Sequence, residues 1–196
     1  MIAVVFLSCC CSYIAFSVVV PHLQDCGMTA QKAAAIQSVM LLTLAGAKFL
    51  CGALSDVLGA KTINLICMLC TALGLFLLAQ VDGTAMAYAS VAVFSVALVM
   101  TTIAVPLLST SLFGYHPQGS IIGIFMALVP AASVITNPVV NSIYDRIGSY
   151  RPIFLWGAVI SLAVMGLMIP LFVLAGIDRK KYEKKRPAAR ETEEAL

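Results

Sequence analysis

Charged side chains are scarce in this chain of 196 residues, of which only 11% are Asp, Glu, Lys or Arg. A soluble domain averages about 25%. Hydrophobic residues make up 61% of the chain, and its mean hydropathy is +1.01. A single core of this size could not hide so much apolar surface. The sequence therefore predicts an integral membrane protein, with the lipid bilayer as a partner and no nucleic acid.

Histidine is scarcer still, with only His22 and His116, and no cluster of His, Asp and Glu stands at a predicted membrane face. A polytopic membrane enzyme would need such a cluster. The sequence thus favours a protein that is not an enzyme and holds no metal or cofactor. Both histidines lie near predicted helix ends, where we expect them to be hydrated rather than to couple protons.

The seven cysteines include none that suggests a disulfide framework. Six fall inside apolar segments, where cysteine packs as a small hydrophobe. The pair Cys67-x-x-Cys70 is accompanied by neither a second cysteine pair nor a histidine, so no metal or redox site is predicted. The full set is Cys9, Cys10, Cys11, Cys26, Cys51, Cys67 and Cys70.

A signal peptide is not indicated at the start of the chain. No Lys or Arg precedes the apolar residues 1–20, and no small-x-small cleavage site follows them. Six apolar segments long enough to span a bilayer predict an all-α fold. We expect a six-helix transmembrane bundle over 1–176 and a charged tail over 177–196, with Thr29 as a helix N-cap. The predicted helices cover residues 2–22, 30–54, 61–80, 84–112, 119–142 and 152–175.

Two loops of the chain echo each other, running Gly52–Lys61 and Asn141–Arg151. Each places Asp-x-x-Gly and then a basic residue between two apolar segments. An odd number of crossings separates the loops, so they should lie on opposite sides of the membrane. This pattern predicts an inverted repeat of three plus three helices, which is typical of secondary transporters.

We interpret these loops as gating elements rather than substrate sites. An Asp beside helix ends can accept backbone N–H bonds, the glycines permit tight turns, and a basic residue can pair with an acidic group or lipid phosphate. A plain solvated turn is the alternative for either loop alone. The predicted gating residues are Gly52, Asp56, Gly59, Lys61, Asp145 and Gly148.

The orientation follows from the basic residues near helix ends. Seven of the twelve lie in the tail, which predicts that both termini are cytoplasmic in a cell membrane. Lys61 then lies on the inner side, and Lys32, Arg146 and Arg151 lie outside. The seven are Arg179, Lys180, Lys181, Lys184, Lys185, Arg186 and Arg190.

Lys48 is the charged side chain that lies well inside an apolar segment, and such residues are usually functional. It stands about six residues before the predicted helix end, roughly 9 Å from the interface at 1.5 Å per residue. Two interpretations of Lys48 remain open: its cation faces a cavity, or its side chain snorkels to the headgroups. Gln37 and Ser55 share its helix face, which favours the cavity. A buried cation in a transport path most naturally receives an anion such as a carboxylate.

The segment 119–142 carries two prolines, Pro130 and Pro138, which either let it flex beside a path or make a static kink. Asn137 and Asn141 are the substrate-binding candidates on this segment. A small-residue stripe is expected to pack against another helix, and a polar stripe to border a cavity. The small stripe is Gly119, Gly123, Ala127 and Ala131; the polar stripe is Ser133, Asn137 and Asn141.

The loop Gly52–Lys61 is similar to the signature loop of the major facilitator superfamily, and Asp145–Arg151 resembles the loop between its helices 11 and 12. The resemblance covers residues 1–176 and implies the C-terminal six-helix half. Pro21–Gly27 and Gly46–Lys48 look most like oxalate/formate antiporters and monocarboxylate porters. This resemblance implies that Lys48 binds the substrate anion. That family has Arg there, and a second intramembrane cation that helix 119–142 lacks, so oxalate is not the expected substrate.

The predicted function is a secondary active transporter, as a half or a fragment, that moves a small organic anion such as a monocarboxylate by rocker-switch alternating access. It would need an N-terminal six-helix half, from the same gene or a separate chain. Two alternatives remain open. One is a truncated membrane protein without transport activity alone, and the other is a facilitator for a different small solute.

Overall fold

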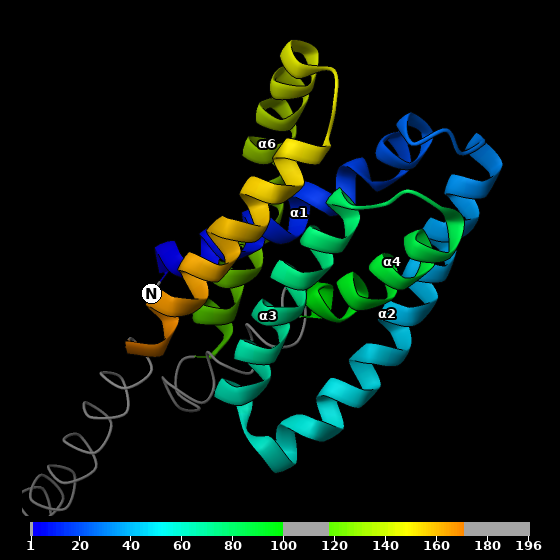
Figure 1. Cartoon of the computed structure of the whole chain (residues 1–196). Coiled ribbons are helices and arrows are strands. Elements are labelled where there is room, and N and C mark those ends of the chain that lie inside the picture. The colour runs from blue at the N-terminus through cyan, green and yellow to red at the C-terminus, as the bar shows by residue number, and fades with distance from the viewer. Residues whose placement is uncertain (1, 100–117, 171–196) are drawn as a thin grey trace, which may run out of the picture.

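The computed structural model describes residues 2–99 and 118–170, and within these ranges the chain is entirely helical, with no strand. Six helices run through the described residues, which confirms the predicted fold class (Figure 1). They are α1 (Ile2–Asp25), α2 (Ala30–Leu58), α3 (Ala60–Ala79), α4 (Thr84–Val99), α6 (Gln118–Ile147) and the unlabelled helix Arg151–Pro170.

Four of these helices are long and apolar enough to cross a membrane. They contain the segments Phe6–Asp25, Ala30–Leu58, Thr62–Ala79 and Arg151–Pro170, with mean hydropathies of 1.7, 1.6, 2.2 and 2.2. The predicted helix parts 100–112 and 171–175, and the tail 177–196, lie outside the described residues.

The predicted end of the first helix at Pro21 and His22 is wrong, because α1 continues to Asp25 with Pro21 inside it. A proline removes one backbone donor, which a helix can tolerate when neighbouring groups compensate. The helix ends instead at Asp25, and Gly27, two residues further on, turns the chain with φ 83°. There the Met28 N–H donates to the carbonyl of Leu23 at 3.1 Å, a glycine-based helix end.

Helices α2 and α6 also extend beyond their predicted ends at 54 and 142, because both Asp-x-x-Gly motifs are helical up to their glycines. The Gly59 N–H (φ 82°) donates to the backbone carbonyl of Ser55 at 2.9 Å. The Gly148 N–H (φ 70°) donates to the backbone carbonyl of Tyr144 at 2.7 Å. The two motifs thus share one local structure, in which only glycine adopts the positive φ without strain. Thr29 is confirmed as the N-cap of α2, since its side chain accepts from the Lys32 N–H at 3.4 Å.

The two motif turns lie at opposite ends of the bundle, as the inverted repeat predicts (Figure 1). We call these ends the Gly59 end, at the bottom of the figure, and the Gly148 end, at its top. The α1–α2 and α3–α4 turns also lie at the Gly148 end. This arrangement follows from helices that cross the same thickness in alternating directions.

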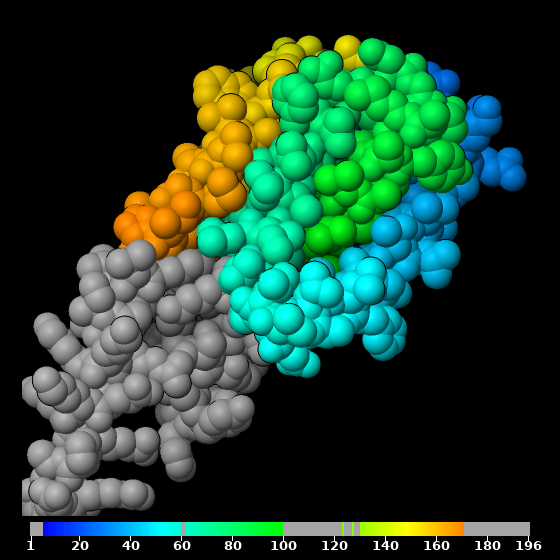
Figure 2. All heavy atoms as spheres, turned by 60° about the horizontal axis from the view of Figure 1, so that its bottom comes forward, coloured from blue at the N-terminus to red at the C-terminus, as the bar shows by residue number. Residues whose placement is uncertain are grey.

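The helices pack side by side, most extensively α4 against α2 and α3 and α1 against α6. Helix α4 lies between α2 and α3 (Figure 2), and α1 packs against both α2 and α6. The helix Arg151–Pro170 contacts α3, where the Ser161 hydroxyl donates to the Met68 carbonyl at 3.3 Å, and its Gly157 approaches Leu75 on α3 and Ile14 on α1. Few contacts join α2 to α6 within the part of the chain that the structure describes.

Two apolar clusters fill the space between these helices. The larger lies toward the Gly148 end and includes Leu23, Ile36, Phe94 and Phe154. The smaller holds Cys9, Cys51, Cys67 and Met68 among its buried residues. All seven cysteines are free thiols, and those in the clusters act as small packing residues, as expected.

Candidate functional site

Lys48 is half-buried on α2, beside the fully packed positions Ala47 and Cys51. It lies ten residues before Leu58, so about 15 Å from the helix end at 1.5 Å per residue. That depth exceeds the expected one because α2 is longer than predicted, and it makes snorkelling to the headgroups harder. Lys48 forms no ion pair with any residue that the structure describes.

Of the two residues predicted to form a polar stripe with Lys48, Gln37 is available for a polar contact and Ser55 is not. Gln37 is half-buried at the same edge of α2. Ser55 is buried, and its hydroxyl donates to the carbonyl of Gly52 at 2.6 Å within its own helix. The hydroxyl of Ser55 is therefore already satisfied, and the stripe is limited to Gln37 and Lys48.

The two asparagines of α6 differ in their surroundings. Asn137 is half-buried, and its Oδ1 atom is buried and has no hydrogen-bond partner among the residues that the structure describes. Asn141, one turn further along, is exposed. A buried acceptor without a donor is unusual, since buried polar atoms are nearly always paired. Asn137 is thus the stronger candidate of the two for a polar partner outside this chain.

The small-residue stripe of α6 does not pack within this chain. Gly123, Ala127 and Ala131 are all exposed, and the position of a Cβ on Gly123 would meet no atom within 4 Å. The burial of Gly119 lies outside what the structure describes. Within this chain the expectation of a packed stripe is therefore wrong, because the face that carries it points away from α1.

The structure does not bring the predicted site residues into one contact. Lys48 and Gln37 stand on α2, Asn137 and Asn141 stand on α6, and α1 packs between the two helices. The four residues therefore belong to two walls on either side of α1.

A strip of α1 between these walls was missed by the sequence reasoning. The buried residues of α1 lie on one half of the helix, and the other half carries half-buried and exposed residues, among them Cys10, Tyr13, Ser17 and Gln24. These four recur at spacings of three, four and seven, so they share one face of the helix. That periodicity was readable in the sequence. We call these four residues the α1 strip.

A shallow depression of about 290 Å³ lies along α6, lined by Pro138, Val139, Ser142, Ile143 and Arg146. All five residues come from one helix. A depression on one helix cannot surround a solute, so it is not the site.

At the Gly148 end, His22 is buried, with only 1% of its surface exposed, which corrects the expectation that it is hydrated. Its Nε2 lies 2.8 Å from the carbonyl oxygen of Leu78 on α3, which can only accept a hydrogen bond. The ring meets Phe154 edge-on at a centroid distance of 4.7 Å and Tyr150 at 6.3 Å. His22 thereby joins α1, α3 and the helix Arg151–Pro170. His116 lies outside the described residues.

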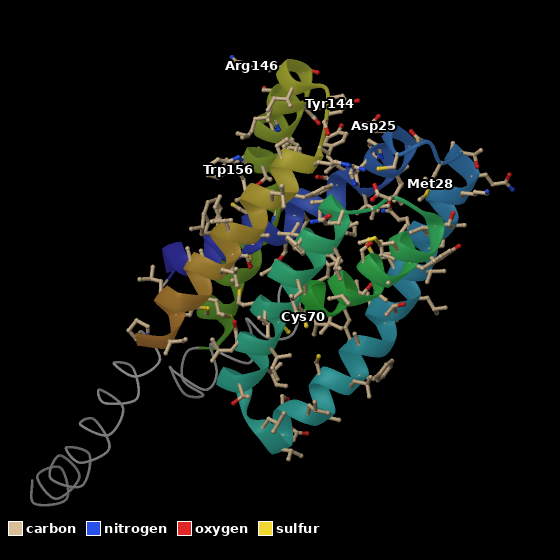
Figure 3. The ribbon with its side chains drawn as sticks, in the orientation of Figure 1. Asp25, Met28, Cys70, Tyr144, Arg146 and Trp156 are labelled. Carbon is tan, nitrogen blue, oxygen red and sulfur yellow. The ribbon has the colours of Figure 1, made fainter. Side chains whose placement is uncertain are left out.

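Further polar contacts surround His22 at this end of the bundle. The Arg151 guanidinium pairs with Asp82 at 2.8 Å and donates to the Val81 carbonyl at 3.3 Å. Tyr144 and Tyr150 stack at 4.1 Å, and Asp25 lies within hydrogen-bond reach of Tyr144 (Figure 3). These contacts tie together the ends of four helices and the α3–α4 turn.

This environment changes the pKa of two titratable groups outside the helices. Burial raises the pKa of the Cys26 thiol above its ordinary value. Burial also raises the pKa of the Tyr150 hydroxyl, and the carboxylates Asp25 and Asp145 add to the effect. Both groups are therefore neutral at physiological pH, and the charges here belong to Arg151 and the carboxylates.

The carboxylates of the motif loops stand apart from these contacts. Asp56 and Asp145 are exposed and make no hydrogen bond or ion pair with described residues. The side chain of Lys61 lies outside what the structure describes. Arg151, the basic residue of the second motif, pairs with Asp82 of another turn rather than with Asp145. The gating role of the loops stays a prediction.

Long apolar helices that pack side by side define a multi-pass membrane protein. Comparison with known protein families matches residues 1–195 to the Major Facilitator Superfamily. The chain belongs to this superfamily, and its activity is therefore transmembrane transport rather than enzymatic catalysis. A comparison with curated individual proteins found no match.

Proposed function

We propose that the chain forms one wall of a secondary active transporter that moves a small organic anion, such as a monocarboxylate, by rocker-switch alternating access. The observation that carries this proposal is Lys48, a deep, half-buried cation without an ion-pair partner among the described residues. An unpaired charge in a region of low dielectric is costly. A carboxylate that binds beside Lys48 relieves this cost, and its release restores the resting state.

The other site residues supply polar contacts along the same path. Gln37 shares the edge of α2 that carries Lys48, and Asn137 and Asn141 stand on the far side of α1. Their amide N–H groups are suitable donors for a carboxylate or hydroxyl oxygen. The unpartnered Oδ1 of Asn137 can only accept, so it would pair with a hydroxyl group of the solute and not with its carboxylate.

The path would be closed by a second six-helix bundle, an N-terminal half from the same gene or a separate chain. The uncovered faces of α2 and α6 flank the opening beside α1, and both carry small residues. Ala45 and Ala53 on α2 and Gly123 and Ala127 on α6 are exposed. Small residues allow close approach of helices in membranes, where packing rather than hydrophobic burial drives association.

The orientation that we propose puts both termini in the cytoplasm of a cell membrane. Seven of twelve basic residues lie in the tail after the last helix, and basic loops stay on the cytoplasmic side. The Gly59 end then faces inward and the Gly148 end outward. We assign the gating role to the two motif turns, with Gly52, Asp56, Gly59 and Lys61 at the inner end and Asp145 and Gly148 at the outer end.

Substitution of Lys48 tests the anion site. We expect Lys48→Ala to lower the uptake of small carboxylates into proteoliposomes by about thirtyfold or more, because loss of a buried charged contact costs roughly 2–5 kcal/mol. Lys48→Arg keeps the charge and should keep most of the uptake. Lys32→Ala is the control, because Lys32 is exposed in the first turn of α2.

Normal carboxylate uptake by Lys48→Ala, at unchanged abundance in the membrane, would remove Lys48 from the site. Uptake of a neutral or cationic solute that is insensitive to Lys48 would favour a facilitator for a different solute. If the reconstituted chain transports only when a second six-helix half is supplied, it is a half without activity alone.

A further inference from the structure

The depression along α6 runs from the Gly148 end into the bilayer. Its lining forms two adjacent rows in which residues recur every four positions, Pro138–Ser142–Arg146 and Val139–Ile143. Arg146 lies in the last turn of α6, and Pro138 lies about 14 Å from the helix end at Ile147, at 1.5 Å per residue. The hydrocarbon of one leaflet is about 15 Å deep, half of a core of roughly 30 Å. The depression therefore spans the depth of a single leaflet.

The chemistry of the lining changes with this depth. At the helix end, Arg146 is exposed and makes no ion pair with any residue that the structure describes. Deeper in the membrane the lining is apolar, with Val139 53% exposed and Ile143 half-buried. Asp145, the neighbour of Arg146, does not line the depression. A cation at the membrane boundary above an exposed apolar surface complements a phospholipid, which has a phosphate at the boundary and acyl chains below it.

A tryptophan on the next helix marks the level of the membrane boundary independently. Trp156, the only tryptophan of the chain, is 69% exposed and lies about 8 Å from the start of the helix Arg151–Pro170. Figure 3 shows Arg146 and Trp156 pointing away from the bundle. Exposed indole rings are enriched where the hydrocarbon meets the headgroups. Arg146 lies nearer the Gly148 end than this level, so its guanidinium is at the depth of lipid phosphates.

The depression and the proposed solute contact lie on opposite sides of α6. Arg146 follows Asn137 by two and a half helical turns, so the two side chains are about 180° apart around the helix axis. Val139 is about 160° from Asn137 by the same geometry. The proposed path runs on the Asn137 side, so most of the depression faces away from it. A lipid can therefore occupy the depression without entering the path.

We propose that the depression binds one phospholipid molecule of the leaflet at the Gly148 end, with its phosphate on Arg146 and an acyl chain along Val139 and Ile143. The guanidinium donates hydrogen bonds to the phosphate oxygens, for which its planar fork is well suited. The lipid fills the hollow and gives the Arg146 cation an anionic partner. This site goes beyond the proposed function, because it involves neither Lys48 nor a transported solute.

Native mass spectrometry of the purified full chain tests the contribution of the phosphate. The probes are dioleoyl phosphatidylcholine and dioleoylglycerol, which carry the same acyl chains with and without a phosphate. We expect the wild type to retain one phosphatidylcholine about tenfold more often than one dioleoylglycerol, because the charged hydrogen bonds need the phosphate.

Substitution of Arg146 tests the residue that holds the phosphate. Arg146→Gln should lower the retention of phosphatidylcholine by about tenfold. The matched control is Lys32→Gln, which should retain the lipid as the wild type does. Lys32 is also an exposed cation at the Gly148 end, but it stands in the first turn of α2 and does not line this depression.

Photolabelling tests the apolar part of the site in the unaltered protein. The probe is a phosphatidylcholine with a diazirine in its acyl chain, in vesicles of dioleoyl phosphatidylcholine. Val139 and Val159 are 53% and 59% exposed, and both lie about 12 Å from their helix ends at the Gly148 end. Only Val139 lines the depression. We expect Val139 to be labelled at least about threefold more than Val159, since a bound chain stays longer than a passing one.

Three outcomes would overturn the lipid site. The first is equal retention of the two lipids, or full retention of phosphatidylcholine by Arg146→Gln. The second is equal labelling of Val139 and Val159, which would show only the general lipid shell; this arm decides even where Arg146→Gln fails to fold. The third is a complex of two chains that Arg146→Gln weakens and that holds no lipid, which would make the depression a contact between copies.

Discussion

His22 connects the ends of α1 and α3 through a buried hydrogen bond between its Nε2 and the carbonyl oxygen of Leu78. Phe154 and Tyr150 cover the ring from the helix Arg151–Pro170. The nearby Arg151–Asp82 pair contributes less, because its side chains are 50% and 80% exposed, and such exposed pairs are worth about 0–1 kcal/mol. We therefore assign the stability of the Gly148 end mainly to His22 and its aromatic neighbours.

Replacement of His22 should test this assignment. We expect His22→Leu to lower the free energy of unfolding by about 1–3 kcal/mol, because the Leu78 carbonyl loses its donor while it stays buried. His22→Gln keeps an N–H donor and should lose less. The measurement is denaturant unfolding in detergent micelles. Gln24→Leu, which alters an exposed residue of the same helix, is the control. Equal stability of His22→Leu and the wild type would contradict the role of this bond.

At the same scale, some residue environments were readable from the sequence and others were not. The cysteines pack as small hydrophobes, as their apolar neighbours indicated. Asn64, by contrast, is fully buried on α3, and neither polar atom of its side chain has a hydrogen-bond partner in the described part of the chain. Nothing in its flanking residues indicates this burial, because the side chains that enclose it come from elsewhere in the chain.

At the scale of the helices, contact between α3 and α4 depends on a missing side chain. A Cβ placed on Gly74 would lie 2.9 Å from the Cα and Cβ of Phe94. The two backbones can approach only because glycine occupies this position. Gly46 on α2 is a useful contrast, since a Cβ there would meet nothing within 4 Å.

We expect Gly74→Ala to destabilise the bundle by about 1–3 kcal/mol, because the overlap involves backbone that cannot move alone. Gly46→Ala should be neutral or stabilising by up to about 1 kcal/mol, since alanine favours the helix. The measurement is the thermal unfolding midpoint of each variant in the same detergent. A Gly74→Ala midpoint equal to that of Gly46→Ala would show that α3 and α4 do not pack this closely.

The helix bounds show where reasoning from the sequence was reliable. The starts at Ala30 and Thr84 match the prediction, and Thr29 caps α2 as expected. The predicted ends were too early at Pro21 and before both motifs. Proline and aspartate usually interrupt helices, but here the next glycine ends each one. Backbone hydrogen bonding within a bilayer favours helix up to a residue that can turn sharply.

At the scale of the whole molecule, the two Asp-x-x-Gly turns have one local structure and lie at opposite ends of the bundle. We therefore expect Asp56→Cys and Asp145→Cys to be labelled from opposite sides of sealed, oriented vesicles by an impermeant thiol reagent. Gly83→Cys is the control, because the α3–α4 turn lies at the Gly148 end and should react from the same side as Asp145→Cys. Reaction of both motif turns from one side would contradict the inverted arrangement.

The sequence by itself determined that this protein lies in a membrane, that it is helical and that it has two equivalent turns. Each of these depends on local chemistry: apolar length, backbone bonding in lipid and the freedom of glycine. Only the tertiary structure decided that α1 packs against both α2 and α6 and that His22 is buried. These features depend on which helices meet, and that is fixed by packing between segments far apart in the chain.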